Sequence, residues 1–360
     1  MEFLMVKLRP LESLMLRGPG EFDPSSRGVY TYAVSLATPR PSTFFGTLLS
    51  AFMPEERQVP ESCLSVNSWR SLLDNCYLKL LDSLGIEAIR GPFVVREDKL
   101  FIPLLLRKRL LLVDYRQARY YLLKKYDNVL EQYFTGSSDV NRLKLYAAMK
   151  LIDQDIEKLE KNMYLVEPQS VELTGVHLRS REATKTVREG YMYTAKYTAY
   201  PQHTEMVFIV AMRKESDKLK ALSGKAVKFG GEGRTARLVV SDRINEPVVT
   251  SMLTNNNEFK YAVLISPTPL DYSDYSKIKA ALIGKYATFG LGFSVAKRRR
   301  KPITPCLCEG SIVKVNKAEK DRLSTLHYGL YSLLSVTRDY YKSMGRLGFA
   351  SFVPLDTPSQ

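Results

Sequence analysis

Residues 206–240 read MVFIVAMRKESDKLKALSGKAVKFGGEGRTARLVV, and this stretch decides the fold class. Residues 206–211 are uniformly apolar, which predicts a fully buried strand. A short helix is expected from Lys218 to Leu222. Two strands within 226–240 then meet at a glycine-rich turn. A buried strand, a helix and a hairpin in close succession indicate mixed helix and sheet.

Elements outside this stretch continue the mixture. Residues 3–8 predict a strand, and Ser42 is expected to cap a helix whose apolar face holds Phe45, Leu48, Leu49 and Phe52. Residues 91–106 predict a hairpin that turns at 97–99. Further strands are expected at 261–266, 311–315 and 348–354, and helices at 275–283 and 326–341. Because strands and helices do not alternate strictly, the pattern favours an α+β fold over a doubly wound sheet.

The length of 360 residues exceeds what one core usually supports, so two domains are expected. We place the first at residues 1–203. It would contain a helical insertion at about 107–165 and a basic hairpin at about 175–200. The second would span 204–360 and would open with the buried strand at 206–211.

The charge balance indicates a polyanionic partner. Lys and Arg number 53 against 38 Asp and Glu, which gives a formal net charge of +15. Such an excess attracts nucleic acid first and an acidic membrane surface second. The longest apolar stretch, 101–113, is interrupted by basic residues 107–109, so no membrane span is expected. The N-terminal residues do not resemble a signal peptide.

Four cysteines are present: Cys63, Cys76, Cys306 and Cys308. They form no CxxC pair and no zinc set, so ordinary buried or free thiols are expected. That pattern suits a reducing cytoplasm. We expect no metal and no cofactor.

Two glycine-rich turns are the first candidates for binding. In Phe229–Arg234 (FGGEGR), successive amides could cradle a phosphate and Arg234 could add a bidentate contact, with Arg237 close behind. A hairpin turn without a ligand explains the same residues equally well. In the second turn, Gly290 and Gly292 lie between aromatic residues and precede the basic run 297–301, which favours bases stacked on rings and phosphates held by cations.

Residues 175–200 interleave cations with tyrosines. Arg179, Arg181, Lys185 and Lys196 alternate with tyrosines such as Tyr193, a mixture suited to single-stranded RNA. An edge hairpin whose charges discourage aggregation is an equally good interpretation.

Signals for catalysis are sparse. The three histidines are His177, His203 and His327. A metal-free ribonuclease usually needs a histidine as its acid or base, and only His177 lies among candidate RNA-binding residues. His327 is expected to be structural. We expect no enzymatic activity.

These motifs, taken in order, resemble the RAMP superfamily of CRISPR proteins, and more narrowly the type III-B (Cmr) subunit that holds the 5′ end of the guide RNA. The matching pieces are LRPLESLMLRGPGEF (8–22), PRPSTFFGTLLSAF (39–52), GVHLRSREATKTVREGYMYT (175–194), KFGGEGRTARL (228–238), YATFGLGF (286–293), KPITPCLCEGSIVKV (301–315) and LGFASF (347–352). The family often has Asp where Glu12 and Ser13 stand, which leaves that position without an assigned role.

The resemblance implies two ferredoxin-like (RRM-like) domains, a helical insertion in the first, and no catalysis. It implies binding of the crRNA 5′ tag, with target RNA nearby. The protein would dock the large polymerase/cyclase subunit to the backbone subunits of the Cmr complex in antiviral defence. The residues expected to contact RNA are Arg17, Arg40, Ser42, His177, Arg179, Arg181, Lys185, Tyr193, Lys196, Gly230, Gly231, Arg234, Arg237, Gly290, Gly292, Lys297, Arg298 and Arg299.

Two alternatives stay open. A RAMP endoribonuclease that processes CRISPR repeat RNA would use His177 as acid or base. A general RNA-binding or ribosome-associated protein would share the RRM-like domains without the CRISPR partners.

Overall fold

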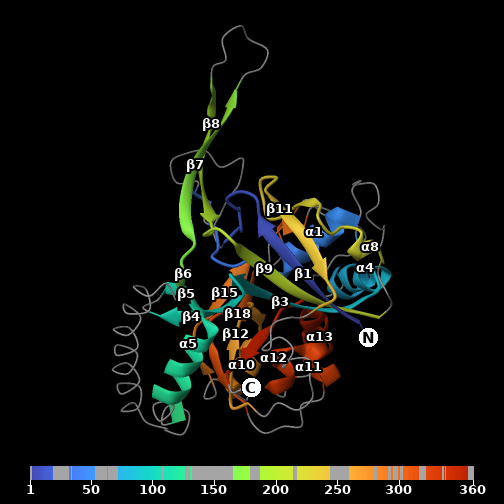
Figure 1. The fold of residues 1–360 in the computed structure, drawn as a ribbon, viewed down its shortest axis with the longest axis vertical. Coiled ribbons are helices and arrows are strands. Elements are labelled where there is room, and N and C mark those ends of the chain that lie inside the picture. Colours follow the sequence, from blue (N-terminus) through green and yellow to red (C-terminus); the bar gives the residue numbers. More distant parts are fainter. Residues whose placement is uncertain are drawn as a thin grey trace.

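The computed structural model describes residues 2–18, 32–33, 35–52, 63, 72–106, 109–125, 130–131, 165–178, 187–213, 217–243, 259–278, 282–290, 293–294, 299–300, 303–315, 322–334, 336 and 338–355. Two sheets and the helices that cover them make up most of this part (Figure 1).

The larger sheet has eight antiparallel strands in the order β10-β11-β1-β9-β3-β4-β5-β6. Their bounds are β1 Glu2–Pro10, β3 Ile86–Arg96, β4 Lys99–Leu106, β5 Arg109–Asp114, β6 Leu165–Val166, β9 Thr204–Met212, β10 Ala226–Lys228 and β11 Thr235–Ser241. The predicted hairpin at 91–106 is confirmed, with its turn at Glu97 and Asp98.

The apolar strand at 206–211 is confirmed as fully buried. It forms β9, which pairs with both β1 and β3 in the larger sheet. Strands β10 and β11 belong to the same sheet, which therefore includes residues from Glu2 to Ser241. An apolar run shows that a strand is buried on both faces, but it does not identify the strands beside it.

The second sheet has four strands in the order β14-β19-β12-β20. Their bounds are β12 Tyr261–Leu264, β14 Leu282–Ile283, β19 Ile312–Lys314 and β20 Phe352–Pro354. Two smaller groups accompany it. One group has three strands, β13 Thr268–Pro269, β18 Ile303–Leu307 and β15 Tyr286–Gly290. The other has two, β16 Phe293–Ser294 and β17 Arg299–Arg300.

Helices and the second sheet cover the two faces of the larger sheet. On one face, Leu4 and Val6 of β1 join a core with Phe44 and Leu48 of α1 (Pro41–Phe52). On the other face, Met5 joins a core with residues of the second sheet and α5 (Tyr115–Arg119). The remaining helices are η2 Leu73–Tyr77, α4 Leu78–Ser83, η3 Tyr120–Lys125, α8 Asp217–Lys220, α10 Tyr272–Ile278, α11 Arg322–Tyr328, α12 Leu330–Leu333 and α13 Asp339–Arg346.

Helix α1 begins two residues before our expectation. The carbonyl of Arg40 accepts from the amide of Thr43 at 2.9 Å, so Pro41 is the first helical residue and Ser42 is not the cap. Proline suits this position because the first helical amide needs no partner within the helix.

The single long helix expected over 326–341 is instead three short ones, α11, α12 and α13. Gly329 separates α11 from α12 with φ 58°, and the next amide, of Leu330, donates to the carbonyl of Ala350 at 2.8 Å. The guanidinium of Arg90 on β3 is buried and donates to the carbonyls of Thr325, Leu326 and Gly345. A backbone hydrogen bond between residues distant in the sequence therefore interrupts the helix that the regular apolar spacing predicts.

The basic hairpin is confirmed and is longer than expected. Strands β7 (Gln169–Leu178) and β8 (Val187–Ala199) pair antiparallel, and β2 (Tyr32–Ala33) runs parallel to β8. Figure 1 shows this hairpin extending away from the two sheets. The helical insertion opens with a strand, β5, before α5 and η3. Most of its remainder lies outside the described residues.

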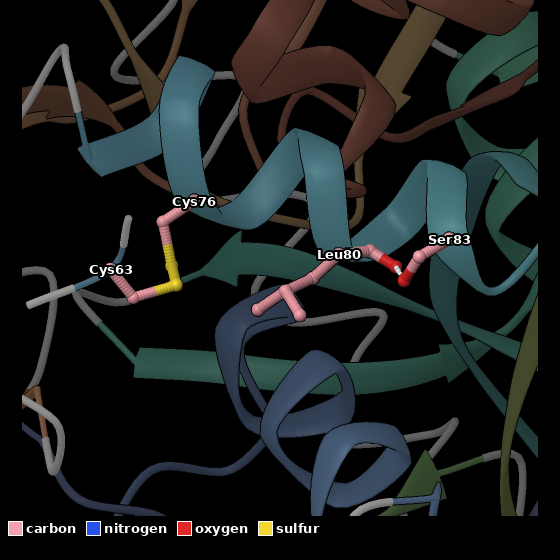
Figure 2. The surroundings of a disulfide bond; sticks show 4 residues. All are labelled: Cys63, Cys76, Leu80 and Ser83. Carbon is pink, nitrogen blue, oxygen red and sulfur yellow. Dashed lines mark hydrogen bonds between the residues drawn. A yellow bond between two sulfur atoms is a disulfide. The ribbon is translucent and has the colours of Figure 1, made fainter. Parts of the chain in front are cut away.

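The expectation of free thiols is wrong for two of the four cysteines. Cys63 and Cys76 form a disulfide with a Cα–Cα distance of 4.8 Å, beside α4 (Figure 2). Cys306 and Cys308 are free and buried, as expected. Cysteines 13 positions apart carry no spacing signal, because only the path of the intervening chain decides whether their side chains meet.

Among the described residues, no helix is long and apolar enough to cross a bilayer.

Candidate nucleic-acid interface

The loop Phe229–Arg234 joins β10 to β11 and packs against the segment that follows β1. The amide of Gly231 donates to the carbonyl of Met15 at 2.8 Å. A Cβ at Gly230 would lie 2.7 Å from the same carbonyl oxygen, and the φ of Gly230 is +94°. Glycine is therefore required at 230 by the approach of two protein backbones. This reason for the glycine holds whether or not the loop also binds a ligand.

Arg234 is held by two protein side chains. Its guanidinium forms an ion pair with Glu12 and lies over the ring of Tyr197 on β8, 4.2 Å from the ring centroid. The amide of Thr235 also donates to Glu12, at 3.1 Å. The hydrogen bond from Arg234 is the largest cause that holds the pKa of Glu12 below its usual value. Glu12, the position without an assigned role, thus fixes an arginine expected to bind RNA.

We call the set Glu12, Met15, Tyr197, Gly231 and Arg234 the Arg234 junction. It unites three separately predicted motifs: the N-terminal motif, the glycine-rich loop and the basic hairpin. The hairpin is fixed there by its own backbone, because the amide and carbonyl of Thr198 pair with those of Leu14. The junction therefore sets the direction in which the hairpin projects.

A second pair of residues predicted to bind RNA, Arg40 and Gly290, is also in contact. Arg40 donates through Nη1 to the carbonyl of Gly290, and its guanidinium lies 5.3 Å from the ring centroid of Phe289. Arg40 is only 7% exposed, and burial lowers its pKa despite the attraction of Glu309. Within the part of the chain that the structure describes, its Nε and Nη2 have no hydrogen-bond partner.

The structure describes only some of the hairpin residues that were predicted to bind RNA. Lys196 on β8 pairs with Glu172 on β7 at 3.0 Å. The backbones of His177 and Tyr193 lie on β7 and β8. Arg179, Arg181 and Lys185 lie outside the described residues.

The other predicted contacts lie on several different elements. Arg17 is exposed and its backbone bridges to Ser35, while Arg237 is exposed on β11. Ser42 lies in the first turn of α1, and the backbone of Arg299 pairs with Ser294 in the β16–β17 ladder. Gly292, Lys297 and Arg298 lie outside the described residues.

His327 has a structural role, as expected. Its Nε2 lies 2.5 Å from Oε1 of Glu87, which also pairs with Arg213. Burial lowers the pKa of His327, although Glu87 opposes the shift. His203 is exposed. No group of three or more His, Cys, Asp or Glu residues in the described ranges could hold a metal ion.

Comparison with known proteins places this arrangement in a family. A family model described as "CRISPR-associated protein (Cas_Cmr3)" matches residues 6–344. The chain belongs to the Cmr3 family. A Cmr3 relative, "CRISPR system CMR subunit Cmr3" of Saccharolobus solfataricus, is 30% identical over 321 residues, which cover 86% of this chain and 85% of the relative. The expected resemblance to a Cmr subunit is confirmed.

Solved structures support the fold of this chain. One similar chain comes from the type III-B Cmr-beta complex bound to cognate target RNA and AMPPnP. It has a TM-score of 0.64 and 23% identity, with 98% of this chain and 99% of that chain covered. A second, from the same type of complex bound to cognate target RNA alone, has a TM-score of 0.65 at 23% identity, with 98% and 97% covered.

Proposed function

We propose that this chain is a non-catalytic subunit of a type III-B CRISPR effector complex that binds the 5′ tag of crRNA. It would join the large polymerase/cyclase subunit to the backbone subunits, with target RNA nearby, and act in the cytoplasm. Membership of the Cmr3 family supports the complex, and the formal charge of +15 supports a polyanionic ligand.

The Arg234 junction is the observation that carries this proposal. It places the base of the basic hairpin against the glycine-rich loop and the N-terminal motif. A guanidinium stacked on a tyrosine is a preformed surface for a base or a phosphate, because the arginine has already lost much of its rotamer freedom. RNA lying here would contact the hairpin and the loop together.

We also propose that both sheets belong to ferredoxin-like units. In the first, β1, β3, β9 and β11, numbered one to four in chain order with other strands between them, lie in the order β11-β1-β9-β3. In the second, β12, β14, β19 and β20 lie in the order β14-β19-β12-β20. Both are the spatial order 4-1-3-2. The boundary between the units would then fall between Ser241 and Tyr261.

The test compares a guide RNA carrying the repeat-derived 5′ end with an RNA of equal length whose 5′ end is scrambled. We expect the wild-type chain to prefer the tagged RNA. Charge reversal in the sequence between β7 and β8, Arg179→Glu with Arg181→Glu, should reduce that preference. The matched control is Lys99→Glu with Lys218→Glu, two exposed lysines outside the junction. Equal affinity of the wild-type chain for both RNAs would contradict tag binding.

The nuclease alternative is separated by incubating the chain with repeat RNA in the presence of a chelator. We expect the RNA to remain intact. Metal-independent cleavage that disappears in His177→Ala would instead favour the endoribonuclease.

A further inference from the structure

Four cations lie on one side of β1, β11 and β10: Lys7, Arg9, Arg237 and Lys228. Arg9 is directly opposite Arg237 in the antiparallel register, and Arg237 is opposite Ala226. Side chains two positions apart on a strand point to the same face, which places Lys7 beside Arg9 and Lys228 beside Arg237. We call these four residues the sheet-face cations.

The sheet-face cations outnumber the carboxylates that form ion pairs with them. Glu205 on β9 pairs with Lys7 at 3.4 Å and with Arg9 at 2.5 Å. In the described ranges, neither Arg237 nor Lys228 has an ion-pair partner, and both are exposed. Like charges directly opposite each other on adjacent strands destabilise a sheet. An anion lying across Arg9 and Arg237 would remove that repulsion.

Along β1 this sheet face is covered as far as Met5, and the sheet-face cations begin after it. Met5, two residues before Lys7, is 3% exposed and packs in the core shared with the second sheet. The side chain of Arg9 is 51% exposed. The face therefore changes from apolar and covered to basic and open within two steps along β1.

The composition of this open surface favours a polyanion over a protein partner. Cores of protein interfaces are depleted in charge and rich in aromatic residues, whereas interfaces with nucleic acid are strongly positive. The large exposed apolar residue near this surface is Leu11, whose amide donates to the carbonyl of Thr235 at 3.2 Å. A single leucine at the margin of four cations does not form an apolar core.

We propose that the sheet-face cations bind the sugar-phosphate backbone of RNA without reading its sequence. This surface adjoins the Arg234 junction, because Thr235 pairs with Lys228 across the ladder and also bonds Glu12. RNA held at the junction could continue across β11 and β1. The inference rests on the proposed function for the identity of that RNA as the guide, but the electrostatic contact itself does not depend on it.

The experiment measures the affinity of the full-length chain for tagged and scrambled single-stranded RNA over a range of salt concentrations. The test variant is Arg237→Gln with Lys228→Gln, which leaves the ion pairs of Glu205 intact. The matched control, Lys99→Gln with Lys218→Gln, removes the same charge from exposed positions elsewhere. Thermal unfolding of each variant checks that the fold is retained.

We expect the test variant to lose affinity for both RNAs by the same factor. The slope of log K against log salt should become shallower by about 1.4, because each phosphate contact on a single strand contributes about 0.7. The preference for the tagged RNA should be unchanged. An affinity and a slope equal to those of the control would overturn the inference. A wild-type chain that binds both RNAs equally would overturn tag binding alone.

Discussion

Arg234 lies with its guanidinium carbon 4.2 Å from the ring centroid of Tyr197, although the two residues belong to different motifs. The same guanidinium also pairs with Glu12. This contact fixes the relation between the glycine-rich loop and the projecting hairpin. The strength of each part of the contact can be measured by substitution.

Glu12→Gln should increase RNA affinity. The substitution removes a negative charge that pairs with Arg234, while the amide can still accept from Thr235. Because exposed ion pairs contribute up to about 1 kcal/mol, we expect a gain of up to about fivefold in affinity, with little change in melting temperature. Glu97→Gln at the distant β3–β4 turn is the control. A loss of RNA affinity in Glu12→Gln would show that Glu12 positions Arg234 for binding instead of competing with the ligand.

Gly230→Ala should destabilise the fold. The new Cβ would lie 2.7 Å from the carbonyl oxygen of Met15, in a backbone conformation with φ +94°. We expect a loss of about 1–3 kcal/mol in the free energy of unfolding, measured by chemical denaturation. Gly46→Ala in α1 is the control, since nothing lies within 4 Å of its Cβ. It should leave stability unchanged or raise it. Equal effects of the two substitutions would contradict the close approach at Gly230.

Stability should fall as the pH falls through the acidic range. Burial lowers the pKa of His327 below its usual value. Burial raises the pKa of Glu87, but its bonds with Arg213 and His327 and the charge of Arg346 outweigh this, so the net shift is downward. For both groups the unfolded chain takes up protons at a higher pH than the folded chain. Their contribution is present above their unfolded pKa values and disappears as the pH falls through the folded values.

The measurement is the melting temperature between pH 8 and pH 4, for the wild type and for His327→Gln. The variant should lose the part of the decline that begins near pH 6.5, the usual pKa of histidine. His203→Gln should not differ from the wild type, because His203 is exposed. A decline that is identical in all three proteins would exclude His327 as its source.

Reduction should destabilise the region around α4. The Cys63–Cys76 disulfide closes a loop with a sequence separation of 13. Loops of that length contribute about 3 kcal/mol in the chain-entropy account. We expect the denaturation midpoint of the wild type to fall in reductant and that of Cys76→Ser to be insensitive to it. A midpoint that reductant leaves unchanged in the wild type would contradict the bond's contribution.

Local sequence determined many of the strands and the turns that join them. The apolar run at 206–211, the turn at Glu97 and the hairpin at 175–200 were predictable because each depends on neighbouring residues: side-chain periodicity, glycine and charge. The net charge of +15 likewise indicated a polyanionic ligand before any contact was known. The order of the motifs identified the family.

Tertiary structure alone decided which distant residues meet. Arg234 and Glu12 are separated by 222 positions and Arg40 and Gly290 by 250, so no spacing rule connects them. The placement of β9 between β1 and β3, and the disulfide at Cys63, depend in the same way on the path of the chain. Sequence patterns report on torsions and local burial, whereas ion pairs, cross-strand neighbours and disulfides form only where long-range packing closes the chain on itself.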